Sequence, residues 1–181
     1  MFKRARIALA IGFVLAALLV LGAQAPPPLP QPSVEQKKLS VFVGTWKDDG
    51  EMKASAFAAG GKISISQTCE WFMGGYSVVC HAETTGSTGD RKSINILNYN
   101  PDENFYEFYE LNSVGRTSLS KCTVDADTWT CNSESNIGGK VLKVRYTIKL
   151  STPDSSTLRA EFSYDSGPWT PTMELKGTRA K

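Results

Sequence analysis

Four cysteines have a spacing in the sequence that points to one specific chemistry. Cys69 and Cys80 flank a Gly-Gly dipeptide, and Cys122 and Cys131 flank an Ala-Asp dipeptide. If each dipeptide is the tip of a two-residue β-hairpin, the two cysteines of each pair face each other across adjacent strands. Directly opposed residues lie about 4.5 to 5.5 Å apart at Cα, which a disulfide tolerates. The spacing therefore predicts disulfides Cys69–Cys80 and Cys122–Cys131.

Metal binding is a weaker interpretation of the same residues. Ten and eight residues separate the paired cysteines, which are not zinc spacings, and His81 is the single histidine available as a partner ligand. We predict no metal site and no cofactor.

Pairs of neighbouring carboxylates could carry acid–base chemistry. The pairs are Asp48 with Asp49, Asp125 with Asp127, and Glu107 with Glu110. The first two are expected in or beside turns, where aspartate is favoured, and no partner acid of different pKa is evident. The Asp125–Asp127 spacing lacks the glycine and distal glutamate of a calcium loop. The sequence also contains no nucleophile or phosphate-loop motif, so we predict a protein that is not an enzyme.

Residues 1–25 have the features of an export signal. A positively charged start precedes an apolar run, residues 7–22, and a site of small residues, 23–25. As a helix the run would reach about 24 Å, less than a bilayer core of about 30 Å. We therefore expect a removed signal and a periplasmic or secreted protein. Pro26 disfavours cleavage after Ala25, which leaves cleavage after Ala23, or retention of the segment as a membrane anchor, as alternatives.

The remaining chain is expected to be one domain. Without the three basic residues of the leader the formal net charge changes from +2 to −1, which gives no electrostatic basis for nucleic-acid binding. Residues 26–32 are mostly proline and predict an extended spacer of about 20 Å. Residues 33–181 are enough for a single hydrophobic core.

Hydrophobic periodicity predicts the elements of this domain. Ser33 and Gln36 form a capping-box pattern that opens a short helix to about Phe42. Thereafter apolar residues alternate with polar ones in ten runs, which start near residues 44, 62, 76, 91, 104, 115, 128, 139, 156 and 169. Tight turns between consecutive runs favour an antiparallel meander, and closure removes exposed edges. The prediction is an all-β fold, a single antiparallel barrel of about ten strands.

The residues around the first strand carry a family resemblance. Gly44-Thr45-Trp46 follows the predicted helix and resembles the Gly-x-Trp of calycin barrels. Together with the later Asn98-Tyr99-Asn100-Pro101 turn, the order of elements resembles DUF1579, a family of lipocalin-like bacterial proteins, over residues 35–179. The resemblance implies a barrel but no reaction. Calycin barrels commonly stack a basic residue of the last strand on the first tryptophan, which implies that Arg179 closes one end over Trp46.

The alternation also predicts what the interior contains. The aromatic residues on inward phases are Trp71, Tyr76, Tyr146, Phe162 and Tyr164. Ten strands can enclose a cavity, so these residues predict a binding module for a small hydrophobic molecule. Gln67 is the inward polar residue, and the phase of Glu107 is ambiguous.

Three other interpretations stay open. The aromatic residues could fill a solid core that binds nothing. The hairpin tip, residues 71–76, could instead contact a protein or a membrane. Nitrobindin-like barrels hold haem through a histidine, which makes haem binding an alternative, but the alternation places His81 opposite Thr68 on the outer face.

Overall fold

The computed structural model describes residues 30–55, 59–72 and 74–180. The predicted export signal, residues 1–25, and the first residues of the predicted spacer, 26–29, lie outside the described residues. Pro32–Lys181 form one compact unit, and the following description concerns that unit. No helix in the described part of the chain has the length and apolar character needed to cross a bilayer.

A short helix precedes the strands, as predicted. Helix α2 covers Val34–Lys38 and continues as the 3₁₀ helix η1, Leu39–Phe42. Its first turn is held by the predicted capping box, because Gln36 N donates to Ser33 Oγ at 3.1 Å and Ser33 N donates to Gln36 Oε1 at 2.7 Å. Leu39 is its one buried residue, which anchors η1 to the barrel core.

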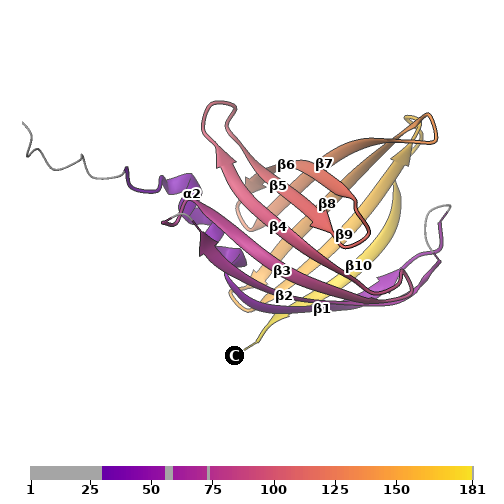
Figure 1. Ribbon diagram of the computed structural model, residues 1–181, viewed down its shortest axis with the longest axis horizontal. Coiled ribbons are helices and arrows are strands. Elements are labelled where there is room, and N and C mark those ends of the chain that lie inside the picture. The colour runs from indigo at the N-terminus through magenta and orange to yellow at the C-terminus, as the bar shows by residue number, and fades with distance from the viewer. Residues whose placement is uncertain (1–29, 56–58, 73, 181) are drawn as a thin grey trace, which may run out of the picture. The chain divides into compact units, whose positions relative to one another are not determined.

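Ten antiparallel strands form a closed barrel (Figure 1). They are β1 Gly44–Met52, β2 Gly61–Phe72, β3 Ser77–Gly86, β4 Arg91–Asn100, β5 Phe105–Asn112, β6 Thr117–Asp125, β7 Thr128–Ile137, β8 Lys140–Thr152, β9 Ser155–Tyr164 and β10 Thr170–Arg179. Each strand pairs with the next in sequence, and β1 pairs with β10 to close the ring. The predicted fold is confirmed, with every strand starting within two residues of its predicted position.

Two hairpins confirm the predicted cysteine pairing. Cys69 is the direct partner of Cys80 in the β2–β3 register, and Cys122 is the direct partner of Cys131 between β6 and β7. Both pairs form disulfides, each with a Cα–Cα distance of 4.0 Å. Disulfides of this kind persist in oxidising compartments.

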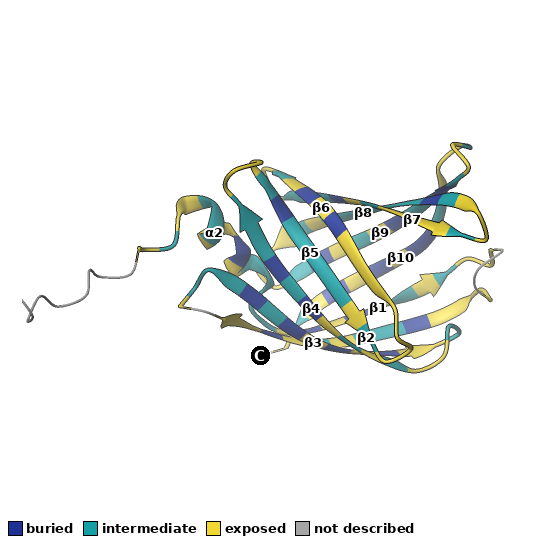
Figure 2. Ribbon diagram, turned by 45° about the horizontal axis from the view of Figure 1, so that its top comes forward, coloured by how far each residue is buried: buried dark blue, intermediate teal, exposed yellow. Residues whose placement is uncertain are grey.

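The buried side chains form two clusters inside the barrel. One packs against η1 and contains both disulfides together with Leu39, Tyr106 and Trp129. The other is smaller and contains Ile63, Ala160, Met173 and Leu175. Along strands such as β3, buried residues alternate with less buried ones, as expected for one inward and one outward face (Figure 2).

Candidate functional site

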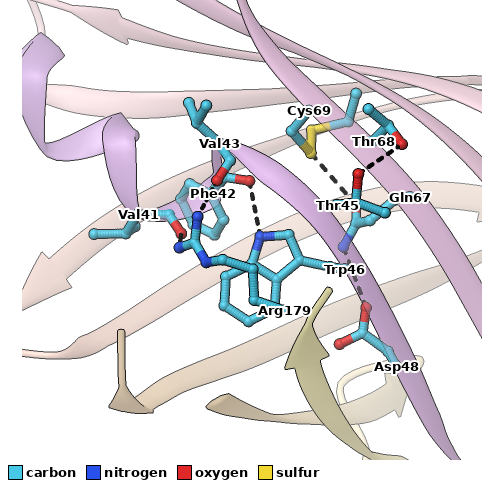
Figure 3. The surroundings of a disulfide bond; sticks show 11 residues. Val41, Phe42, Val43, Thr45, Trp46, Asp48, Gln67, Thr68, Cys69 and Arg179 are labelled. Atoms are coloured by element: carbon cyan, nitrogen blue, oxygen red, sulfur yellow. Dashed lines mark hydrogen bonds between the residues drawn. A yellow bond between two sulfur atoms is a disulfide. The ribbon is translucent and has the colours of Figure 1, made fainter. Parts of the chain in front are cut away.

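The end of the barrel next to α2 is closed by two side chains of the first and last strands. The Arg179 guanidinium lies over the Trp46 ring, 4.4 Å from its centroid, as the family resemblance implied. Arg179 also donates to the carbonyl oxygens of Val41, at 3.0 Å, and Val43, while Trp46 Nε1 donates to Phe42 O at 3.0 Å (Figure 3). The carbonyls at the end of η1, which have no partner within the helix, are thereby satisfied.

An aromatic cluster fills the same end from inside. Phe42, Tyr106 and Trp129 pack edge to face, with centroids 4.6 and 4.9 Å apart. The Tyr106 hydroxyl donates to Glu35 Oε2 at 2.6 Å, which ties helix α2 to β5. Burial and the hydrogen bond to Glu35 raise the pKa of Tyr106. This end therefore serves closure, and space for a ligand must lie farther along the barrel.

The five predicted ligand-binding aromatic residues do not line one common site. Because η1 runs directly into β1 and successive strands reverse direction, Trp71 and Tyr76 lie at the α2 end. Phe162 and Tyr164 lie near the opposite end, and Tyr146 lies midway along β8. The sequence period indicates which face of a strand a residue occupies but not its height along the barrel. Inward phase alone therefore could not show that the five residues lie at different heights. Tyr146, Phe162 and Tyr164 remain together as one part of the interior surface.

The half of the barrel away from α2 is not completely filled. Ile65, Tyr146 and Leu158 are inward residues near the middle of their strands, and each is only partly buried. Burial nevertheless raises the pKa of Tyr146 to about 12, so its phenol is enclosed by protein although the residue as a whole is only partly buried. Inside a closed ring of strands, such exposure requires internal space of at least the size of a water molecule.

This internal space has an apolar and a polar wall. The apolar wall comes from β2 and β8–β10, with inward residues Ile63, Ile65, Leu142, Val144, Leu158, Phe162, Met173 and Leu175. The polar wall comes from β4–β7, with inward residues Arg91, Ser93, Asn95, Glu110, Asn112, Ser118, Ser120, Ser133 and Ser135. The inside of the barrel is therefore amphipathic.

Glu110 is the central ionisable group of the polar wall. It is the direct cross-strand partner of the buried Asn95, so both side chains point inward. Asn112 Nδ2 donates to Glu110 Oε1 at 3.1 Å and holds the carboxylate in place. Glu107, whose phase was ambiguous, has the opposite parity and faces outward, where it accepts a hydrogen bond from Asn100 at 3.3 Å.

Charges of the polar wall act on the phenol of Tyr146. Burial is the main cause of the raised pKa of Tyr146. The negative charge of Glu110 raises this pKa further, and the positive charge of Arg91 lowers it. Ionisable groups from β4, β5 and β8 thus share the same part of the interior. The sequence indicated Gln67 as the inward polar residue and did not identify Arg91 or Glu110, which lie in strands where polar residues interrupt the apolar alternation.

A second inward carboxylate belongs to Asp48. It lies within β1, 7% exposed, and its Oδ2 accepts a hydrogen bond from Gln67 Nε2 at 3.2 Å (Figure 3). Burial is the main cause that raises the pKa of Asp48 to about 6. Gly177 lies beside it, and a Cβ at that position would collide with Asp48 Oδ1 and Ser156 Oγ. The expectation that Asp48 sits in or beside a turn is wrong, whereas the inward position of Gln67 is confirmed.

A surface hollow of about 720 Å³ lies over the outer faces of β1–β5. It includes exposed His81, which pairs with Thr68 on the outer face as predicted. Several of its polar side chains pair with one another: Lys92 Nζ lies 2.7 Å from Glu83 Oε1, and the hydroxyl groups of Thr45 and Thr68 are 3.3 Å apart. Among the described residues no group of three or more histidine, cysteine or acidic side chains is arranged to hold a metal ion. The interior, with its buried polar groups, is the stronger candidate site.

Solved structures share this lipocalin-like barrel. Rv2717c from M. tuberculosis is 12% identical with a TM-score of 0.57, over 83% of this chain and 100% of that one. The S-type phycobiliprotein lyase CPES from Guillardia theta is 14% identical with a TM-score of 0.54, over 81% and 93%. At these identities the likeness concerns the fold. No curated protein matches the sequence.

The family model described as DUF1579, a protein of unknown function, matches residues 31–179. This span includes every strand of the barrel and the helix before it. The chain therefore belongs to the DUF1579 family, as the Gly44-Thr45-Trp46 pattern and the order of elements predicted.

Proposed function

We propose that this protein is a non-enzymatic, extracytoplasmic binding module that holds a small, largely hydrophobic molecule inside the barrel. The observation that carries the proposal is the partial burial of Ile65, Tyr146 and Leu158, inward residues in the middle of a closed barrel. A purely structural barrel would gain dispersion energy by filling that space. Two disulfides support an oxidising compartment, which the predicted export signal would supply.

Replacing an inward aromatic residue with lysine should weaken the binding of a neutral hydrophobic probe. We expect N-phenyl-1-naphthylamine to gain fluorescence with the full-length protein, and Phe162→Lys or Tyr146→Lys to weaken its binding at least tenfold, because an ammonium group would occupy the apolar space. Thr147→Lys is the matched control, since it adds the same charge next to Tyr146 but on the outer face of β8. The proposal fails if the wild-type protein does not enhance the probe, or if the control weakens binding as much as the inner variants.

A second candidate function is contact with a protein partner through the β2–β3 hairpin tip. Trp71 is 37% exposed and Phe72 is 55% exposed at this tip, while Met73 lies outside the described residues. Val34 of α2, at the same end of the barrel, is also exposed. Exposed aromatic side chains are typical of interface centres.

Phe72→Ser should remove the contact with a partner without unfolding the protein. We expect the free energy of unfolding to change by less than about 1 kcal/mol, because the side chain is largely in solvent, and we expect capture of a partner in cross-linking to be lost. Ile94→Ser, on the exposed outer face of β4, is the control that should leave capture intact. Equal capture by the wild-type protein and Phe72→Ser would exclude the tip as the contact.

A further inference from the structure

Asn95 is an unsatisfied polar group inside the barrel. Its residue is 6% exposed, and its Oδ1 has no hydrogen-bond partner in the described part of the structure. Leaving a buried acceptor without a partner costs about 1 to 3 kcal/mol, so such groups are rare in native proteins. An acceptor kept at this cost, directly opposite the partly buried Glu110, indicates a donor that arrives with a ligand.

Glu110 adds a negative charge at the same place. It is directly opposite Asn95 in the β4–β5 register, and the amide of Asn112 already occupies its Oε1. A carboxylate has room for several donors, so Glu110 can accept a further hydrogen bond from a ligand. The two side chains together present acceptors, and a carboxylate head group would meet repulsion there.

The other charged side chains of the interior also favour a head group that donates hydrogen bonds over a carboxylate. Asp48 contributes a second inward carboxyl group. The inward cation of the polar wall, Arg91, also acts on Tyr146, but it is the first residue of β4, at the end away from α2, and Asn95 lies four residues farther into the strand. Arg179, the inward cation of β10, already donates to Val41 and Val43.

We infer that the molecule bound in the barrel is an amphiphile with a hydrogen-bond-donating head, an amine or a hydroxyl, which docks on Asn95 and Glu110 while its apolar tail lies on the opposite wall. This inference rests on the proposed function and names the chemical class of its ligand. The protein should accordingly select against fatty-acid-like amphiphiles, whose head group offers acceptors where the wall already has acceptors. The tail would contact Ile65 and Leu158, which are partly buried and face the same space.

Three ten-carbon ligands that differ only in the head group test the inference. Calorimetric titration of the full-length protein at pH 7.5 with decylamine, decan-1-ol and decanoate should give binding of the first two and at least tenfold weaker binding of decanoate. Glu110→Gln should weaken decylamine about tenfold and decan-1-ol less, because a hydrogen bond to a charged acceptor is the stronger one. Glu107→Gln removes the same charge from the outer face of the same strand and should change neither affinity.

Asn95→Leu provides a readout that a purely structural role would not produce. The substitution replaces the unsatisfied acceptor with an apolar side chain of the same branched shape, so the melting temperature should rise while the affinity for both donor ligands falls several-fold. If Asn95 merely supported the fold, stability would fall instead.

The outcomes separate the two proposals. Binding of none of the three ligands to the wild-type protein contradicts the proposed function itself. Equal binding of all three, or tightest binding of decanoate, leaves the proposed function standing and overturns the inference about the head group. Affinities that are the same in Glu110→Gln, Asn95→Leu and the wild-type protein overturn it as well.

Discussion

Replacing Arg179 with methionine should lower the free energy of unfolding by about 4 kcal/mol. The change removes a cation stacked on Trp46, worth about 0.5 to 2 kcal/mol, and keeps most of the apolar stem. It also removes donors to the carbonyls of Val41, Val43 and Pro153. Each carbonyl that stays buried without a partner costs about 1 to 3 kcal/mol, so their loss dominates the effect.

Urea unfolding and hydrogen exchange would measure this loss. Amide protection should fall in residues 35–43, because Arg179 holds the end of η1 against the barrel. Arg159→Met is the matched control: its side chain is 51% exposed and pairs with Glu161, so we expect a change within about 0.5 kcal/mol. Equal destabilisation by the two substitutions would show that Arg179 acts as an ordinary surface charge.

Replacing Asp48 with asparagine should stabilise the protein, and the gain should depend on pH. Burial raises the pKa of Asp48 in the folded state to about 6, above its ordinary value of 3.8. Well below pH 3.8 the carboxyl group is protonated in both states, so Asp48→Asn and the wild-type protein should differ little there. As pH rises from 4 to 6, the unfolded chain releases the proton first, and the wild-type protein loses stability by up to about 3 kcal/mol.

Unfolding free energies at pH 4, 5, 6 and 8 would check this dependence. The advantage of Asp48→Asn should grow between pH 4 and 6 and then level off. Asp49→Asn, the neighbouring substitution on the outer face, should show the opposite sign, because hydrogen bonds from Ser64 and Lys47 lower the pKa of Asp49. A stability difference for Asp48→Asn that does not vary with pH would show that its carboxyl group is not buried in the folded state.

The hairpin registers could be predicted from the sequence because two local signals agree. The Gly-Gly and Ala-Asp tips set the pairing, and the cysteine positions are compatible with only that register. The closed topology follows from the same short connections. Local turn chemistry therefore determined most of the architecture.

The candidate site was harder to predict, since it depends on height along the barrel and not only on the face of a strand. Asp48 shares the inward parity of Trp46, which was a usable signal, but two adjacent aspartates before Gly50 are typical of a turn. Glu110 and Asn95 interrupt the apolar alternation of β4 and β5, so no pattern of hydrophobic residues could locate them.

Pairing of β1 with β10 has a consequence for biosynthesis. The first strand can pair with β2 early, but it cannot pair with β10 until the ribosome has made that last strand, so the ring must close after translation of the whole domain. Both disulfides, by contrast, link residues only 11 and 9 positions apart and can form as soon as each hairpin emerges. A newly made chain can therefore oxidise correctly while its ends are still apart, and closure then joins hairpins that are already cross-linked.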